Sequence, residues 1–387
     1  MNNKRVLCHV FYDEYPKDSR VRRYTLFLLK KGYTVIIICS RGEGEPKTEH
    51  HPDLHIFRIP VSKKRKSIPS RLWEYLQFLF IAAMMVIYMM VKYRPSVFHV
   101  HTLPDFLVFA CIVPRMFGKK VILDFHELFP EFMMQLTSKS CKSFVIELLL
   151  LQEKLSFWFA TDIIVFHDPA KDLLSRRIPS KKEIVTVMNG IDVTEFNNIT
   201  RVQQKKFNIV YNGTISHYLN LPLILDAMMV IRSQKKEIFD SIEFHIYGDG
   251  PATAGLLAKA DLYGLRNVFY HGRMPFHLMV QELSKASVCI LPPKQDIYSD
   301  LYYSLKLLEM IYLSIPVIAT DLKTYRFYFP EGCIFYFPSG EIEQLAERMI
   351  EVFTNPEKVG LYTKRALVEL RKNDWSEMLK RYEKILN

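Results

Sequence analysis

The sequence predicts an α/β protein with two doubly wound parallel sheets, one in each of two domains. The chain has 387 residues, which is too long for one ordinary core and suits two domains of roughly 150 to 200 residues each. Short apolar runs alternate with amphipathic helical stretches, as expected when parallel strands are joined by helices. The alternation stops at a polar segment without apolar periodicity, residues 197–206, and then starts again. We therefore place the domain linker there.

The first domain is predicted over residues 1–196. Gly32 follows a helical stretch that ends in two lysines, which is typical of a helix C-terminus. The amino terminus is expected to be the first strand and not a secretion signal, because His9 and later charges interrupt its apolar run. In chain order the predicted elements are a strand at 5–12, a helix at 20–31, a strand at 33–40, a long apolar helix at 71–94, and strands at 96–102 and 119–126.

The second domain is predicted over residues 207–365, and residues 366–387 are expected to form a C-terminal helix. The opening strand, within 207–215, is followed by the same alternation of apolar and helical runs. The predicted strands lie within 207–215, 242–251, 267–273, 287–293, 316–320 and 333–338, and the predicted helices within 221–233, 254–264, 278–286 and 302–313.

Composition limits the class of partner. The formal charge is +11, from 52 basic and 41 acidic residues, which favours an anionic lipid surface, a phosphorylated small molecule or nucleic acid. Nucleic-acid binding is the weakest of these, because basic residues are dispersed and do not interleave with aromatic ones. The cysteines lack metal-ligand or redox spacing, so a reducing cytoplasm fits best. They are Cys8, Cys39, Cys111, Cys141, Cys289 and Cys333.

The helix at 71–94 has three interpretations. It is long enough to span a bilayer and follows a basic cluster, Lys63, Lys64, Arg65 and Lys66. A span would separate strands that must pair in one sheet, and Glu74 and Gln77 oppose it further. It could also be a fully buried helix. We favour a helix that packs on the sheet and touches an anionic leaflet with one side and with the basic cluster.

Candidate ligand-binding residues follow the predicted strands, because such folds bind ligands at the carboxyl ends of their strands. In the first domain these are His101, Asp105, His126 and Glu127. His99 is expected to be structural and to face away from His101. His126 is the best candidate, because it directly follows an apolar strand and precedes an acid.

In the second domain, glycines follow three strands and suggest a phosphate or nucleoside site built from backbone donors and helix N-termini. Each is weak alone, and "GDGP" is often only a turn. Neither a P-loop nor a dinucleotide fingerprint is present, which argues against an NTPase or an ordinary NAD enzyme. Lys306 and Glu309 lie one helical turn apart after a strand, so they can neutralise a diphosphate and bind ribose hydroxyls. The alternative is a solvated ion pair.

Several motifs resemble the retaining glycosyltransferases of family 4, which have the GT-B fold of two Rossmann-like domains. The resemblance covers nearly the whole chain, and "NGID" with Phe196 and the "KLLE" to "PVIATD" run are its most specific parts. It also includes "VFHVHTLPD", "VILDFHELFPE", "IYGDGP", "VFYHGR" and "NDWSEMLKRYEKIL".

The resemblance implies sugar transfer from a nucleotide-sugar with retention of anomeric configuration. The nucleotide, UDP or GDP, would bind the second domain, and the acceptor would bind the first. His126 would lie near the donor sugar, Glu309 would bind the ribose, and Lys306 would face the diphosphate without any protein metal. The remaining donor-side positions that it implies are Asn189, Gly213, Thr214, Gly248, Asp249, Arg273, Leu301 and Leu305.

The sequence departs from the family pattern at two places. Leu301 stands where the first acid of the paired-glutamate motif would be, with Asp300 one step away. The basic pair after the glycine would fall at about Thr214 and Leu219, and neither is charged. Some branches of the family carry a lysine before "LLE" and lack the first glutamate, and this chain resembles them.

The sequence therefore predicts a cytoplasmic glycosyltransferase, peripheral at the inner face of the cell membrane. Its acceptor would be lipid-linked or a glycan, in polysaccharide or glycolipid assembly. The alternative is a non-catalytic GT-B-like subunit that docks a partner enzyme at the membrane, which the missing cations motivate.

Overall fold

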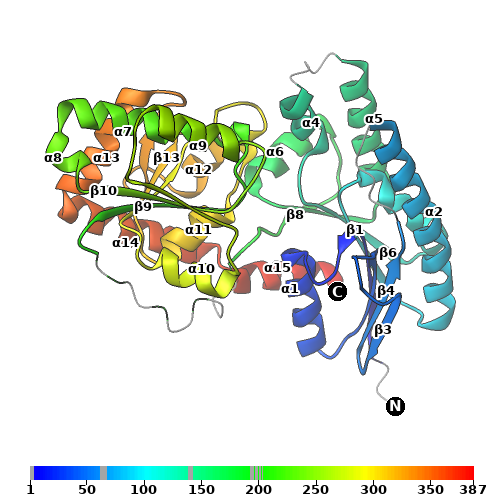
Figure 1. Cartoon of the computed structure of the whole chain (residues 1–387). Helices are drawn as coiled ribbons and strands as arrows, with labels where there is room; N and C mark the ends of the chain where they lie inside the picture. The colour runs from blue at the N-terminus through cyan, green and yellow to red at the C-terminus, as the bar shows by residue number, and fades with distance from the viewer. Residues whose placement is uncertain are drawn as a thin grey trace. The chain divides into compact units, whose positions relative to one another are not determined.

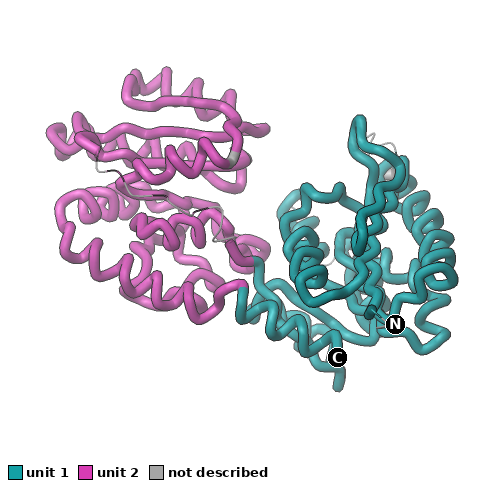
Figure 2. Tube along the Cα trace, turned by 90° about the horizontal axis from the view of Figure 1, so that it is seen from below, with its two compact units in different colours: residues 1–189, 376–387 teal, residues 190–375 magenta. Residues whose placement is uncertain are grey.

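The computed structural model describes residues 4–61, 68–137, 143–191, 196, 199, 202 and 204–387. The chain divides into two compact units (Figure 2). Unit 1 is Met1–Asn189 with Ser376–Asn387, and unit 2 is Gly190–Trp375. Each unit is built on one largely or wholly parallel sheet with helical connections, so the predicted pair of doubly wound α/β domains is confirmed.

Unit 1 has an eight-stranded sheet in the order β3-β4-β2-β1-β5-β6-β7-β8 (Figure 1). All neighbouring strands are parallel except β3, which pairs antiparallel with β4 in a hairpin. Its elements are β1 (Val6–Glu14), α1 (Ser19–Lys30), β2 (Thr34–Ser40), β3 (Thr48–His51), β4 (Leu54–Ile59), α2 (Ile68–Lys92), β5 (Val97–His101), η1 (Asp105–Cys111), α3 (Ile112–Met116), β6 (Lys120–Phe125), α4 (Phe129–Thr137), α5 (Phe144–Phe159), β7 (Asp162–Val165), α6 (Asp168–Arg177), β8 (Ile184–Thr186) and α15 (Trp375–Leu386).

Unit 2 has a six-stranded parallel sheet in the order β11-β10-β9-β12-β13-β14. Strand β9 is central, so the loops that follow β9 and β10 emerge side by side at one edge. Its elements are β9 (Phe207–Asn212), η3 (His217–Leu219), α7 (Pro222–Gln234), α8 (Lys236–Phe239), β10 (Ile242–Tyr247), α9 (Thr253–Leu262), β11 (Val268–Gly272), α10 (Phe276–Leu283), β12 (Val288–Leu291), η4 (Ser299–Leu301), α11 (Leu305–Tyr312), β13 (Val317–Thr320), α12 (Lys323–Tyr328), β14 (Phe335–Phe337), α13 (Ile342–Thr354) and α14 (Pro356–Lys372).

The central strands of unit 1 are apolar because helices cover both faces of the sheet. In β2, the residues from Val35 to Cys39 are all 0% exposed, which explains the continuous run "VIIIC" in place of an alternating pattern. Helix α1 begins where the carboxylate of Asp18 accepts hydrogen bonds from the backbone N–H groups of Arg20 and Val21. This cap directs α1 away from the carboxyl end of β1.

The boundaries between the two units differ from the predicted domain boundaries, which were 1–196, 207–365 and 366–387. Unit 2 already starts at Gly190, and α14 belongs to it through Lys372. Only α15 returns to unit 1, where Tyr382 is 0% exposed and packs on Tyr24 with ring centroids 4.2 Å apart. The C-terminal segment that joins unit 1 is therefore shorter than the predicted 366–387.

Helix α2 packs on the sheet with one face and is open on the other. Phe78, Ala82, Val86 and Met89 are 0% exposed, whereas Phe80 is 69% exposed. The segment Ser70–Lys92 is the one described helix that is long and apolar enough to cross a membrane, and 28% of its most apolar window is buried. A fully buried helix is thus excluded.

Some predicted features lie outside the described residues. These are the basic cluster Lys63 to Lys66, Cys141, and part of the linker 197–206. The five cysteines that the structure describes, which are Cys8, Cys39, Cys111, Cys289 and Cys333, are buried free thiols.

Candidate active site

Two glycines bring the strand ends of unit 2 into direct contact. The backbone N–H of Gly213, just after β9, donates to the carbonyl of Tyr247 at 2.8 Å, and the N–H of Gly248 donates to the carbonyl of Gly272 at 2.7 Å. A Cβ on Gly248 would lie 1.9 Å from the carbonyl oxygen of Gly213. Because its φ is also +134°, only glycine fits there. The loops after β9 and β10 therefore form one packed layer.

Lys306 lies on Gly213. It is the second residue of α11, and its Cε would be 2.4 Å from a Cβ on Gly213, whose φ is +114°. Its ammonium lies 5.5 Å from the centre of the Tyr211 ring. Among the residues that the structure describes, none forms a hydrogen bond or ion pair with this ammonium. Lys306 is thus a positioned cation with donors to spare.

The surroundings of Lys306 keep it charged. Burial alone lowers its pKa, but the oxygens of Tyr302, Tyr211 and Tyr218 and the Glu309 carboxylate more than offset this. The pKa of Lys306 is therefore raised above its usual value, and the side chain is an ammonium at neutral pH.

Glu309 lies one turn further along α11 and is half-buried. Its Oε2 accepts a hydrogen bond from Nδ2 of Asn212 at 3.3 Å, so the last residue of β9 holds it. The Oδ1 atom of Asn212 is buried without a hydrogen-bond partner. A carboxylate and an amide at this strand end can together bind vicinal hydroxyls.

The structure places the other predicted donor residues as follows. Asp249 caps its own turn, since its Oδ1 accepts from the N–H of Gly250 at 2.7 Å and from Oγ1 of Thr253 at 3.1 Å, which lowers its pKa. Arg273 is 81% exposed along its side chain, with Nε 4.0 Å from Asp249. Thr214 is exposed, and Leu301 and Leu305 are half-buried.

Three further positions that the sequence analysis considered for the donor site make other contacts. Asn189 belongs to unit 1, where its Oδ1 accepts a 3.5 Å hydrogen bond from Arg20. Asp300 does not replace the missing acid. Its carboxylate forms a 3.0 Å ion pair with the ammonium of Lys323, and it accepts a 3.3 Å hydrogen bond from the backbone N–H of Lys323, the first residue of α12. Leu219 is 5% exposed and packs in the core.

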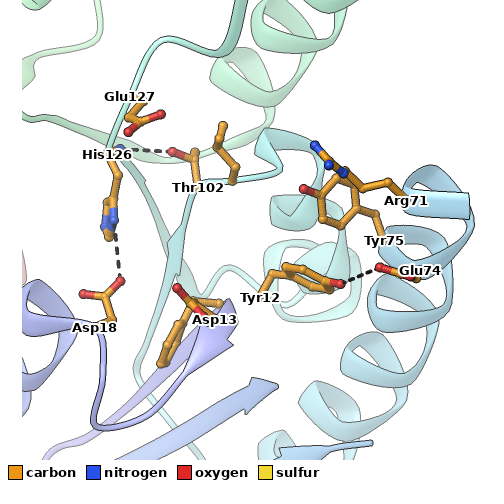
Figure 3. A pocket seen from close by; sticks show the side chains of 11 residues that line it. Tyr12, Asp13, Asp18, Arg71, Glu74, Tyr75, Thr102, His126 and Glu127 are labelled. Atoms are coloured by element: carbon orange, nitrogen blue, oxygen red, sulfur yellow. Dashed lines mark hydrogen bonds and ion pairs between the residues drawn. The ribbon is translucent and has the colours of Figure 1, made fainter. Parts of the chain in front are cut away.

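Unit 1 contains a cavity of about 340 Å³ where β1, β5 and β6 end. Figure 3 shows its side chains, which include the predicted His126 and Glu127 and also Arg71, Glu74 and Tyr75 from α2. Its lining includes four carboxylates, those of Asp13, Asp18, Glu74 and Glu127, and one arginine, Arg71. Such a wall of acceptors suits a ligand rich in hydroxyl groups.

Glu74 lines this cavity and has one carboxylate oxygen without a hydrogen-bond partner. The residue is 5% exposed, and its Oε2 accepts a 3.3 Å hydrogen bond from the hydroxyl of Tyr12 (Figure 3). Its Oε1 is buried and has no hydrogen-bond partner. A buried acceptor left unpaired is unfavourable.

His126 connects the cavity to a buried polar network. Its backbone N–H donates to Oγ1 of Thr102 at 3.0 Å, and its Nδ1 lies 3.8 Å from the Asp18 carboxylate. Its Nε2 lies 3.0 Å from Nδ1 of His101, whose Nε2 is in turn 2.9 Å from Nδ1 of His9. The three imidazoles thus form a chain from the cavity into the core.

The ion pair of Arg20 and Asp124 lies beside this chain. Arg20 donates to both carboxylate oxygens, at 3.0 and 2.8 Å, and both side chains are at most 2% exposed. Burial raises the pKa of Asp124, but Arg20 and the neighbouring histidines outweigh it and hold that pKa well below its usual value. Burial lowers the pKa of His9 and His101, so both rings are neutral.

Three predictions for unit 1 need correction. His99 lies on the same face as His101, with ring centroids 4.1 Å apart, because residues two apart on a strand share a face. His101 is 1% exposed and reaches the cavity only through His126. Asp105 is 0% exposed beneath α5 and does not line the cavity, and burial together with the Glu153 carboxylate raises its pKa.

Among the residues that the structure describes, two histidine-rich groups have ligand atoms close enough for a metal ion. They are His9, His99 and His101, and His101, Asp124 and His126, with ligand atoms within 4.8 Å of one another. The fit is poor, because ring nitrogens of His9, His101 and His126 already face one another and the Arg20 cation occupies the Asp124 carboxylate.

The sequence analysis missed Asp18, Arg20, Arg71, Glu74 and Asp124. Glu74 carries a signal in the sequence, since it is an acid inside a long apolar helix, and the same feature opposes a membrane span. Asp124 directly precedes "FH" within an apolar strand, where a buried acid implies a buried partner.

Comparison with known proteins agrees with this arrangement. The family model described as Glycosyltransferase Family 4 matches residues 19–195, and the one described as Glycosyl transferases group 1 matches residues 206–355. No curated protein sequence matches the chain.

Several solved structures share the fold over nearly the whole chain. A sucrose-phosphate synthase from Thermosynechococcus elongatus is 16% identical with a TM-score of 0.76, covering 99% of this chain and 98% of that one. A UDP-forming trehalose-phosphate synthase from Burkholderia xenovorans, in complex with glucose-6-phosphate, is 12% identical with a TM-score of 0.75, covering 98% and 100%. An E. coli trehalose-6-phosphate protein bound with UDP-2-fluoro glucose is 11% identical with a TM-score of 0.74, covering 98% of each chain. These likenesses show the GT-B fold, and with the two family matches the conclusion is that this chain is an enzyme of the group 1 glycosyltransferases, family 4.

Proposed function

We propose that the protein is a retaining, metal-independent glycosyltransferase that moves a sugar from a UDP- or GDP-linked donor to a membrane-linked acceptor. The observation that carries this proposal is the position of Lys306, an unpaired ammonium on Gly213 at the strand ends of unit 2. A fixed cation at this place neutralises the diphosphate as it leaves, which stabilises the transition state.

The remaining donor contacts come from the same layer of loops. Glu309, held by Asn212, binds the ribose hydroxyls. The backbone around Gly213 and Gly248 approaches the diphosphate, and Thr214 and Arg273 are exposed and reach the nucleotide. Because Lys306 supplies positive charge, the chemistry needs no metal ion; retention of configuration rests on the family resemblance.

The acceptor binds the cavity of unit 1. The carboxylates of Asp18, Glu74 and Glu127 favour hydroxyl groups and repel a phosphate. We therefore assign an uncharged sugar or polyol headgroup to this chain, in contrast to the glucose-6-phosphate bound by the structural relative from Burkholderia xenovorans. His126 contacts the transferred sugar, and the Glu74 carboxylate, which lines the cavity, accepts a hydrogen bond from an acceptor hydroxyl.

A membrane-linked acceptor is supported by α2, which lines the cavity with Arg71, Glu74 and Tyr75 and exposes Leu72, Trp73 and Leu76 on its other side. Polysaccharide or glycolipid assembly at the cytoplasmic face of the membrane uses such acceptors. The buried free cysteines fit that compartment.

A donor screen tests the proposal. Purified protein is incubated with UDP- and GDP-sugars, and release of the nucleoside diphosphate is measured with and without glycolipid acceptors. We expect release with one donor and its loss in Glu309→Ala. If no donor binds by calorimetry at high concentration, the chain is instead a non-catalytic GT-B-like subunit that docks a partner enzyme.

A further inference from the structure

The helices α2, α3 and α5 lie on one side of the unit 1 sheet. The connection from β1 to β2 runs toward one edge of the sheet. The connections from β4 to β5, from β5 to β6 and from β6 to β7 all run toward the other edge. Right-handed crossovers then put α1 on one face and α2, η1 with α3, and α5 on the other. Both α2 and α5 pack against η1, and Figure 1 shows them on the same outer side of unit 1.

Helix α2 presents a continuous apolar stripe on its outer side. The exposed positions recur every three or four residues after Trp73, which is one face of a helix. They are Trp73 at 62%, Leu76 at 44%, Phe80 at 69%, Met84 at 58%, Tyr88 at 51% and Val91 at 68% exposure.

Helix α5 presents a second stripe of the same kind. Phe144, Leu148, Leu151, Leu155 and Trp158 recur at intervals of four and three, and each is about half exposed or more. Between the two stripes, Met116 at the end of α3 is 79% exposed and the adjacent Phe117 is 70% exposed. We name the exposed side chains of α2, α3 and α5 together with Phe117 the apolar face. Soluble monomers rarely expose apolar patches this extensive without a partner.

The charges on these helices are mostly positive. Arg71, Lys92, Arg115 and Lys154 are exposed, whereas Glu74 and Glu153 are buried. On α2, α3 and α5 as described, Glu147 is the one exposed carboxylate. Two copies of the chain joined through this face would bring cation against cation, which disfavours a dimer. An anionic bilayer complements both the apolar side chains and the cations.

We infer that the apolar face lies in the headgroup region of an anionic bilayer, with Trp73 and Trp158 in the lipid and Lys92 and Lys154 on the phosphates. The cavity then opens beside the membrane, because the first turns of α2 carry Trp73 on one side and Glu74 on the other. A lipid-linked acceptor puts its headgroup in the cavity while its chain stays in the bilayer; this last point rests on the proposed function. Helix α2 does not span, because a span would remove Phe78, Ala82, Val86 and Met89 from the core.

Intrinsic tryptophan fluorescence tests the contact directly. The full chain is mixed with vesicles of phosphatidylcholine and phosphatidylglycerol in equal parts, with dibrominated acyl chains as quenchers. We expect quenching in the wild type and its loss in the double variant Trp73→Phe/Trp158→Phe, which keeps Trp375. Unquenched emission from vesicle-bound wild type, or quenching that the double variant retains, overturns the inference.

Sedimentation with the same vesicles measures the strength of binding. Phe80→Gln and Phe144→Gln should each lower the partition coefficient roughly tenfold. Lys92→Gln and Lys154→Gln should each lower it about fivefold, only when phosphatidylglycerol is present. Leu26→Gln is the matched control, since Leu26 is 47% exposed on α1, on the opposite side of the sheet, and its substitution should change nothing.

The outcomes separate this inference from the proposed function. Vesicle binding by a protein that binds no nucleotide-sugar supports the membrane contact and removes the enzyme mechanism. Transfer to a soluble acceptor without vesicle binding does the reverse. A salt-independent dimer that Phe80→Gln dissociates, without binding to vesicles, assigns the face to a second copy and overturns the membrane contact.

Discussion

The side chain of Lys306 occupies the space that a Cβ on Gly213 would need, with its Cε 2.4 Å from that position. The two residues are 93 positions apart in sequence (306 minus 213) and come from α11 and from the loop after β9. Their contact fixes the cation against the strand end. Position 213 therefore requires glycine for two reasons: its positive φ, and the space that the Lys306 side chain needs.

Gly213→Ala should therefore weaken donor binding by displacing Lys306. The clash and the φ of +114° both oppose alanine, and we expect roughly 10- to 100-fold weaker binding of the nucleoside diphosphate, from about 1 to 3 kcal/mol of strain. Calorimetry measures this. Gly360→Ala, with open space around it inside α14, should leave the affinity unchanged and raise stability by about 0.5 to 1 kcal/mol. Equal affinities for Gly213→Ala and wild type would refute the contact's role.

Lys306→Gln should lower kcat more than it raises KM. The diphosphate gains charge as the sugar leaves, so the ammonium stabilises the transition state more than the ground state, by about 2 to 4 kcal/mol. Steady-state kinetics with the preferred donor measure the split. Lys323→Gln is the control, because Lys323 is a partly paired cation on α12 whose partner is Asp300. A variant with unchanged kcat would show that the cation faces no leaving group.

Asp124→Asn should destabilise unit 1 by about 3 to 5 kcal/mol, because it leaves the Arg20 guanidinium buried without its counter-charge. The paired replacement Arg20→Met/Asp124→Leu should recover most of that loss, since neither buried charge then remains. Urea unfolding followed by hydrogen exchange of β1 and β5 amides reports on unit 1 alone. If the single and paired variants are equally unstable, the ion pair is not what the network depends on.

Unit 1 should lose stability as the pH falls below about 6.5. Burial lowers the folded-state pKa of His9, His99 and His101, so below pH 6.5 the unfolded chain binds protons that the folded chain does not. This stability is complete above the unfolded pKa and falls by about 1.4 kcal/mol per pH unit for each histidine until its folded pKa is reached.

His9→Phe should reduce this pH slope in the same unfolding measurement. Tyr382→Phe is the control, because it removes the 2.9 Å contact with His99 and keeps every histidine. It should lower stability equally at all pH values. An unchanged slope in His9→Phe would contradict neutral burial of that ring.

The sequence predicted the two sheets because their strands are continuous apolar runs, and it predicted Lys306 and Glu309 because helical spacing puts residues three apart on one face. It could not predict the Gly213 contact, which depends on how α11 packs on β9. The same limit applies to Asp300, which is adjacent in sequence to the position of the missing acid, whereas its carboxylate pairs with Lys323 on α12.

In unit 1 the local pattern identified His126 and Glu127 but not their neighbours. Glu74 and Arg71 come from a helix about 50 residues earlier (126 minus 74 is 52), and only the parallel order of β1, β5 and β6 brings them together. Asp105 was predicted as a ligand-binding residue because it follows a strand, yet it begins η1 and is buried beneath α5. Long-range packing decides these cases.

Binding of UDP and GDP to the wild type and to Glu309→Gln, measured by calorimetry, tests the donor site most directly. Glu309 accepts a hydrogen bond from Asn212 and faces the place assigned to the ribose, so the variant should bind its nucleotide roughly 10- to 100-fold more weakly, because a charge-assisted hydrogen bond contributes about 1.5 to 3 kcal/mol. Lys306→Gln should weaken binding as well, and Lys323→Gln should not. Nucleotide affinity that is the same in all four proteins would contradict a donor site at Lys306 and Glu309.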